Sequence, residues 1–140
     1  VEGITGVEVG VTSDAGIDLV VGLTQAAYGE YPVIMRLPME RAVELAPGAI
    51  NAGATAVSLA PPRGIYPAGG GYLVQGRLYG PAVLPVALRV VHALAQMNIA
   101  TIGAGGVYTA EHKNAMLEAG ACAIQLDSLL WRSAGYRLFA

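Results

Sequence analysis

The 140-residue chain has the length of a single domain and an unusually apolar composition, with 54% hydrophobic and 13% charged residues. Its net charge of −2 and its scattered basic residues argue against nucleic acid and anionic membranes as partners. A small monomer needs a polar surface, so we expect a missing part of the same chain or a partner subunit to cover some of the apolar surface of this chain. We therefore expect an oligomer.

Short apolar runs alternate with longer segments of helical pattern along the chain. Strands are predicted at Val7–Val11, Val33–Leu37, Ala56–Leu59, Ala100–Gly103 and Ala123–Leu126, and helices at Ile17–Tyr28, Arg41–Ala52, Pro81–Met97 and Thr109–Ala119. A short hairpin is predicted at Tyr72–Tyr79. Thr109 is expected to cap the last helix, and Gly53 and Gly120 to follow helix ends. This alternation predicts an α/β fold with a parallel sheet and right-handed crossovers.

The chain contains an internal repeat. The run A-G-A-T-A-V-S-L at residues 52–59 returns as A-G-A-C-A-I-Q-L at residues 119–126, and the preceding strand and helix repeat with it. Five strands are too few to close an eight-stranded barrel, so the pattern alone leaves an open doubly wound sheet as an alternative.

The uncharged stretches at residues 45–62 and 90–110 are long enough to suggest membrane segments. Both are interrupted by Gly, Pro, Asn or Gln, and we interpret them as helix, turn and strand. The single cysteine, Cys122, is interpreted as a buried small residue in a reducing compartment. We therefore expect a soluble, cytoplasmic protein of one domain, residues 1–140.

Two glycine-rich segments follow predicted strands and precede predicted helices. They are I-G-A-G-G-V at residues 102–107 and G-R-L-Y-G-P-A at residues 76–82. Adjacent glycines let a backbone approach an anion closely, and a helix N-terminus offers N–H groups and positive potential. The alternative for the first segment is a tight turn that needs positive φ angles. His92 and His112 have no partners at metal-ligand spacing, and we expect no metal.

These segments resemble those of dihydroorotate dehydrogenases. G-R-L-Y-G-P-A-V-L-P-V-A-L resembles that family's G-G-L-S-G-P-A-I-K-P-I-A-L, and I-G-A-G-G-V resembles its I-G-M-G-G-I. The run at residues 119–126 is similar to A-G-A-x-A-V-Q-V, and V-I-M-R-L at residues 33–37 to V-I-V-K-L. The resemblance is collinear and implies a parallel (β/α) barrel of TIM type, of which this chain covers about the last five strands.

The resemblance further implies an FMN-dependent oxidoreductase that acts on a CH–CH group of a small-molecule substrate. Arg36 takes the place of a family lysine near the electron-accepting end of the flavin; the alternative is a salt bridge at a strand end. The residues implied in cofactor binding, mostly around the flavin phosphate, are Arg36, Gly80, Ala104, Gly105, Gly106, Asp127 and Ser128.

Departures from the family pattern concern the substrate. Gly10–Ala15 replaces the family's N-L-S-C-P-N; Ser13 falls at the position of the general base, but both asparagines are absent. Capping of the next helix by Ser13 or Asp14 is the alternative role. Ala60 replaces a further asparagine, so the substrate is expected to be altered.

Three functions remain open from the sequence. The first is the FMN-dependent oxidoreductase, and the second is a non-catalytic half-barrel, ligand-binding or structural, that assembles with another chain. The third is a phosphate-binding barrel enzyme of another pathway. Arg63 and Arg77 either bind an acidic ligand or face water. Asp127 is expected to turn away from a phosphate or to pair with Arg132. Trp131 and Tyr136 are expected to pack against other parts of the protein.

Overall fold

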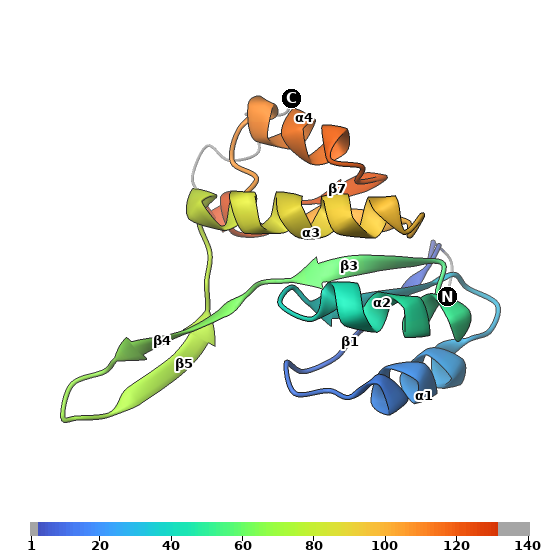
Figure 1. Ribbon diagram of the computed structural model, residues 1–140, viewed down its shortest axis with the longest axis horizontal. Coiled ribbons are helices and arrows are strands. Elements are labelled where there is room, and N and C mark those ends of the chain that lie inside the picture. Colours follow the sequence, from blue (N-terminus) through green and yellow to red (C-terminus); the bar gives the residue numbers. More distant parts are fainter. Residues whose placement is uncertain (1–2, 132–140) are drawn as a thin grey trace.

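The computed structural model describes residues 3–131, in which strands and helices alternate (Figure 1). A five-stranded sheet has the order β1-β2-β3-β6-β7, and all of its neighbouring strands are parallel. Its strands are β1 (Val7–Gly10), β2 (Val33–Pro38), β3 (Ala56–Ala60), β6 (Thr101–Ala104) and β7 (Ala123–Gln125). The parallel sheet predicted from the sequence is therefore present, with shifts of one residue at the strand ends.

Helices lie side by side along one face of this sheet (Figure 1). They are α1 (Ile17–Ala27), α2 (Ala42–Asn51), α3 (Leu84–Gln96) and α4 (Ala110–Glu118), with short 3-10 turns at Pro81–Val83 and Ser128–Trp131. The predicted third helix thus begins with a 3-10 turn. None of the helices within residues 3–131 has the length and apolar character needed to cross a membrane.

The two faces of the sheet differ in chemistry. On the helix-covered face, Met35, Leu37, Val57 and Leu59 are fully buried and form part of one continuous apolar core. Because side chains alternate along a strand, the opposite face carries the residues in between. Arg36 of β2 and Ser58 of β3 lie on that face and are direct neighbours in the register of the two strands.

The helix ends follow the sequence signals for caps. Gly53 and Gly120 directly follow the C-cap residues of α2 and α4 and have φ angles of 113° and 107°, conformations that favour glycine. The Thr109 side chain accepts a hydrogen bond from the His112 N–H at 3.2 Å, so its predicted capping role is confirmed.

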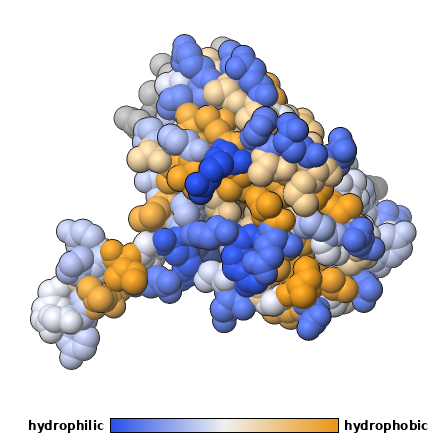
Figure 2. Space-filling model, viewed as in Figure 1, coloured by the Kyte–Doolittle hydropathy of each residue, from blue (hydrophilic) through white to orange (hydrophobic). Residues whose placement is uncertain are grey.

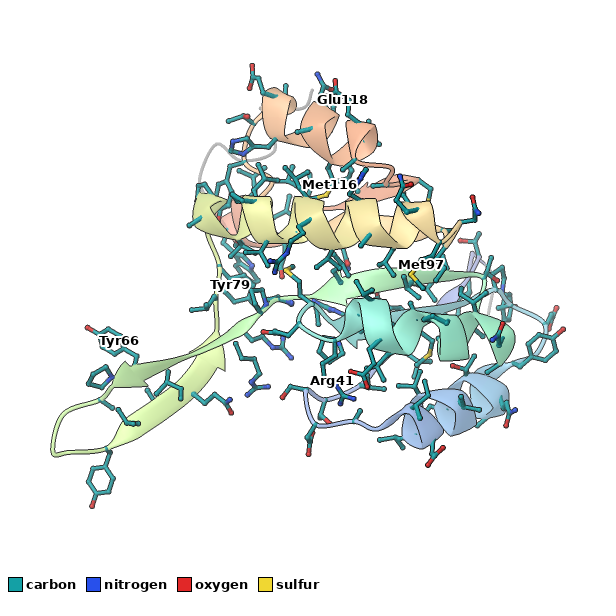
Figure 3. The ribbon with its side chains drawn as sticks, viewed as in Figure 1. Arg41, Tyr66, Tyr79, Met97, Met116 and Glu118 are labelled. Atoms are coloured by element: carbon teal, nitrogen blue, oxygen red, sulfur yellow. The ribbon has the colours of Figure 1, made fainter. Side chains whose placement is uncertain are left out.

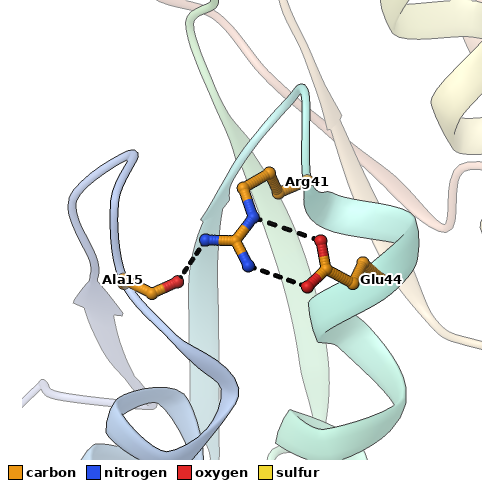
Figure 4. A network of polar contacts seen from close by, with 3 residues as sticks. All are labelled: Ala15, Arg41 and Glu44. Atoms are coloured by element: carbon orange, nitrogen blue, oxygen red, sulfur yellow. Dashed lines mark hydrogen bonds and ion pairs between the residues drawn. The ribbon is translucent and has the colours of Figure 1, made fainter.

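The start of α1 does not follow its prediction. Its N-cap is Gly16, which makes no side-chain cap, so the expected capping by Ser13 or Asp14 is wrong. The loop is instead held by Arg41, which donates to the Ala15 carbonyl oxygen at 2.5 Å and forms two hydrogen bonds with Glu44 (Figure 4). A guanidinium at the start of α2 thereby positions the loop after β1.

A long antiparallel hairpin, β4 (Arg63–Pro67) and β5 (Leu73–Arg77), projects from the body of the molecule as an arm (Figure 1). The predicted Tyr72–Tyr79 hairpin corresponds to its second strand only; the first strand was missed because prolines precede and end it. Side chains on the arm are largely exposed, including Tyr66 near its tip (Figure 3), Ile65 and Leu73. Figure 2 shows apolar residues on the surface of the arm.

Two side chains expected to be buried are exposed. Cys122 precedes β7, which is an edge strand of the described sheet, and its thiol donates to the Thr101 carbonyl oxygen at 3.3 Å. Trp131 is 87% exposed, so its expected packing is wrong within the described residues. No further strand pairs with the outer edge of β7 within residues 3–131, which leaves Cys122 uncovered. Arg132 and Tyr136 lie outside the described residues.

Candidate functional site

A cavity lies where the strands of the sheet end at their carboxyl termini. Its volume is about 440 Å³ including the space open to solvent, and its enclosed part is about 30 Å³, room for roughly two water-sized groups. Carboxyl ends of parallel strands are where α/β folds bind ligands. The residues predicted to bind the cofactor all line this cavity: Arg36, Gly80, Ala104, Gly105, Gly106, Asp127 and Ser128.

Four parts of the chain contribute these residues. Arg36 comes from β2, Gly80 from the segment between β5 and α3, the 104–106 residues from the end of β6, and Asp127 and Ser128 from the segment after β7. The two glycine-rich segments therefore share one cavity, although 19 residues, 83–101, separate them in the chain. We call this cavity the glycine pocket.

Ser13 is not part of the glycine pocket. It is exposed and lines a second pocket together with Arg63 and Arg77, and the two pockets share Pro61. Beside it, the Thr12 hydroxyl lowers the pKa of the exposed Asp14 carboxyl through a hydrogen bond, and the Asp14 backbone N–H adds to this effect. A carboxylate with a lowered pKa is a weaker proton acceptor, so Asp14 is poorly suited to activate Ser13.

The glycines of the pocket are required for different reasons. Gly106 has a φ of 76°, and a Cβ added there would lie 2.3 Å from the backbone nitrogen of Leu84 at the start of α3. Gly80 has a φ of 126°, but a Cβ there would meet nothing within 4 Å. Position 106 therefore requires glycine both for its positive φ and for its close approach to the start of α3. At Gly80 only the positive φ requires glycine, because the space where a Cβ would lie is empty.

Arg36 is held in place by an acidic partner that the sequence did not reveal. Its guanidinium lies 3.8 Å from the Glu8 carboxylate, and the Ser58 hydroxyl donates to the same carboxylate at 2.5 Å. The Arg36 and Glu8 side chains are 27% and 32% exposed. The salt bridge considered as the alternative role of Arg36 is thus present, and it occurs at the wall of the glycine pocket.

Tyr108 and His112 organise the segment that follows the glycine pair. The Tyr108 hydroxyl and the Ser128 hydroxyl are 2.6 Å apart, and this hydrogen bond joins the segments after β6 and β7. The Tyr108 N–H donates to His112 Nδ1 at 3.2 Å, while Thr109 accepts from the His112 N–H. Some donors at the start of α4 are therefore already used, which leaves the glycine turn as the better place for an anion. The signal available in the sequence was a capping pattern, Thr109 followed three residues later by His112.

Gln125 is a further residue of the pocket that sequence reasoning missed as a site residue. Its Oε1 atom is buried and has no hydrogen-bond partner within residues 3–131. A buried polar atom without a partner costs free energy, so its presence at a cavity wall fits a group that binds there. Asp127, by contrast, is exposed. Among the described residues, no group of histidine, cysteine and acidic side chains is arranged to hold a metal ion.

Comparison with known proteins assigns a family to this part of the chain. The profile of the dihydroorotate dehydrogenase family matches residues 69–137, which include both glycine-rich segments. The chain is a partial match to the dihydroorotate dehydrogenase family. The resemblance inferred from the sequence is thereby confirmed, and the match begins after Ser13 and Arg36.

Curated relatives of this dihydroorotate dehydrogenase-like chain agree with the profile. The catalytic subunit of dihydroorotate dehydrogenase B (NAD(+)) from Bacillus mycoides is 48% identical over 54 residues. The corresponding subunit from Bacillus thuringiensis is 46% identical over a stretch of the same length. Each match covers 38% of this chain and 18% of the relative, so the similarity concerns a small part of those proteins.

Solved structures match the fold over most of the chain. Dihydroorotate dehydrogenase from Eimeria tenella, in complex with ferulenol, superposes with a TM-score of 0.72 at 15% identity, covering 94% of this chain and 46% of that one. GMP reductase from Trypanosoma brucei, in complex with guanosine 5'-monophosphate, gives a TM-score of 0.53 at 20% identity, covering 88% and 26%. The predicted partial barrel of TIM type is confirmed, since the parallel sheet matches part of these barrels.

Proposed function

We propose that the chain is part of a cytoplasmic FMN-dependent oxidoreductase that resembles dihydroorotate dehydrogenase and acts on a CH–CH group of an altered substrate. The observation that supports this proposal most is that all residues implied in cofactor binding line one pocket at the carboxyl ends of the strands. The family match includes both glycine-rich segments of that pocket.

The pocket suits the phosphate end of FMN. Its enclosed part has room for a small group, and the positive φ angles of Gly105 and Gly106 favour a concave backbone that receives anions. Gly80 leaves the opposite side open. The unpartnered Gln125 amide oxygen is an acceptor, so it suits a donor group elsewhere on the ligand rather than the phosphate. The rest of a flavin would lie in the part of the pocket that opens to solvent.

When bound, FMN supplies the acceptor for the hydride taken from the substrate. Arg36 would lie beside it, because the ion pair with Glu8 holds the guanidinium at the pocket wall. A fixed positive charge favours an anionic reduced flavin. Ser13 would remove the substrate proton only if another group accepts the hydroxyl proton, and the neighbouring Asp14 is weakly basic. The proton-transfer half of the reaction is therefore the less supported half.

The alternative function is a non-catalytic half-barrel, ligand-binding or structural, that assembles with another chain. Three observations favour it: the sheet has open edges at β1 and β7, Ser13 lies outside the glycine pocket, and Ala60 stands where the family has an asparagine. Unpaired strand edges invite pairing with further chain. In both proposals the missing barrel half or a partner subunit completes the sheet.

Flavin binding separates the two functions. We expect the purified chain to take up FMN near one equivalent, measured by the absorbance and quenched fluorescence of the flavin. Arg36→Gln should weaken binding about tenfold, because it removes one charge-assisted contact at the pocket wall. Arg89→Gln, an exposed position on α3, is the control for loss of the same charge and should bind normally. A chain that is folded but takes up no FMN would refute the oxidoreductase.

A further inference from the structure

The second pocket, which contains Ser13, carries two arginines at the base of the hairpin arm. Arg63 is the first residue of β4 and Arg77 the last residue of β5, and both are exposed. The remaining wall is formed by the segments at the carboxyl ends of β1, β2 and β3. We call this the arginine pocket; its volume is about 400 Å³ including the space open to solvent.

The two arginines face each other across the hairpin. They are direct partners in the antiparallel register. The neighbouring pair toward the base of the arm is Pro62 and Leu78. It is joined by a hydrogen bond from the Leu78 N–H to the Pro62 carbonyl oxygen at 2.8 Å. Since hydrogen-bonded and non-hydrogen-bonded pairs alternate, Arg63 and Arg77 form a non-hydrogen-bonded pair, the closer of the two kinds. Like charges directly opposite each other destabilise a hairpin unless an anion lies between them.

The surrounding carboxylates do not neutralise this pair. Within residues 3–131, neither guanidinium forms an ion pair. Glu40 also lines the pocket, but its Oε1 atom accepts a hydrogen bond from the Arg63 backbone N–H at 2.8 Å and so anchors the hairpin. The residues that line the pocket, two arginines and one glutamate, carry a net positive charge, which suits a ligand group with a single negative charge. The exposed Asp14, whose carboxyl pKa the charge of Arg63 helps to lower, lies nearby but does not line the pocket.

We propose that Arg63 and Arg77 bind the carboxylate of a small acidic molecule in the arginine pocket. The planar guanidinium fork matches a carboxylate with two parallel hydrogen bonds. Pro38, Ala60 and Pro61 supply apolar contacts for the remainder of the ligand. Because Pro61 is common to both pockets, such a ligand would lie next to whatever binds in the glycine pocket.

The identification of this acidic molecule as the substrate rests on the proposed oxidoreductase function. The binding of a carboxylate in the arginine pocket does not depend on that function. In that case, the arginines on the hairpin take over the recognition that the absent asparagines provide elsewhere in the family.

The test is a titration of the full chain with benzoate, followed by NMR of the backbone amides. Benzamide, which has the same shape but no charge, and inorganic phosphate are the comparison ligands. We expect benzoate to shift the amides of Thr12, Ser13 and Ala60, and benzamide to leave them unchanged. Arg63→Gln and Arg77→Gln should each weaken benzoate binding about tenfold. Arg89→Gln should change it less than about twofold, because exposed charges outside the pocket are screened by salt.

Equal binding of benzoate by the wild type and both arginine variants would overturn the proposal. So would equal binding of benzamide, or tighter binding of phosphate than of benzoate. Amide spectra of each variant show whether it is folded, and the exposed positions of both arginines favour folding. Repeating the titration with and without FMN keeps the two proposals apart: benzoate binding without FMN uptake refutes the oxidoreductase alone, and FMN uptake without benzoate binding refutes the carboxylate site alone.

Discussion

Replacing glycine with alanine should have opposite effects at two positions of this chain. At Gly103, in β6, an added Cβ would lie 2.4 Å from Cγ and 2.8 Å from Sδ of Met116. Carbon atoms pack best at about 3.5–4 Å, and Met116 is fully buried and cannot turn into solvent. We expect Gly103→Ala to lower the free energy of unfolding by about 1–3 kcal/mol, the usual cost of overpacking.

At Gly22, in the exposed part of α1, an added Cβ would meet nothing within 4 Å. The same substitution there should raise the free energy of unfolding by about 0.5–1 kcal/mol, because alanine favours the helix and restricts the unfolded chain. Gly22→Ala is therefore a matched control for the chemistry of the replacement. The contrast in sign depends on the space around each position and on the helical backbone at Gly22.

Urea unfolding followed by far-UV circular dichroism measures both variants. Met116→Ala alone should cost about 2–5 kcal/mol, because it leaves a cavity. In the double variant with Gly103→Ala, the new methyl group fills part of that cavity, so the combined loss should be smaller than the sum by at least about 0.5 kcal/mol. Additive losses, or an undisturbed Gly103→Ala variant, would refute the packing described for β6 and α4.

Two further predictions concern the polar contacts that hold the loops. Thr109→Ala should lower the free energy of unfolding by about 1 kcal/mol, because the His112 N–H loses its acceptor at the start of α4; an unchanged urea midpoint would contradict this role. Stability should also fall in acid, because the hydrogen bond from Arg41 holds the pKa of the Glu44 carboxyl below its usual value of 4.5. The contribution of this carboxylate to the free energy of unfolding is complete above pH 4.5. It is lost as the pH falls through the lower pKa of the folded state. Glu44→Gln should therefore make the acid-side loss of stability shallower in pH-dependent unfolding, and a slope equal to that of the wild type would argue against this contribution.

The main sheet could be predicted because each of its strands is a short apolar run between helical segments. Val33–Leu37 is an example, predicted within one residue of the observed β2. The first strand of the arm, β4, escaped prediction because its partner β5 supplies its hydrogen bonds and most of its side chains are exposed. A strand with little apolar burial and prolines at its ends has no periodic signal to detect.

The glycine pocket could be predicted because carboxyl ends of parallel strands meet at one edge of a sheet, whatever their separation in sequence. The contacts around the glycine pocket could not be predicted from the sequence. Glu8 reaches Arg36 and Ser58 only through the register of three neighbouring strands, which the sequence does not specify. The same holds for Arg63 and Arg77, whose direct opposition depends on where the hairpin turns.

The order of strands in the sheet is the same as their order along the chain. Each new strand of this sheet therefore docks onto the strand of the same sheet that precedes it in the chain, and no strand has to wait for a later segment to be inserted beside it. Contacts that form between neighbours in sequence involve short loop closures, which favours rapid folding. During synthesis on the ribosome, the chain is expected to gain structure progressively from its N-terminal side, with the growing edge always the most recently formed strand.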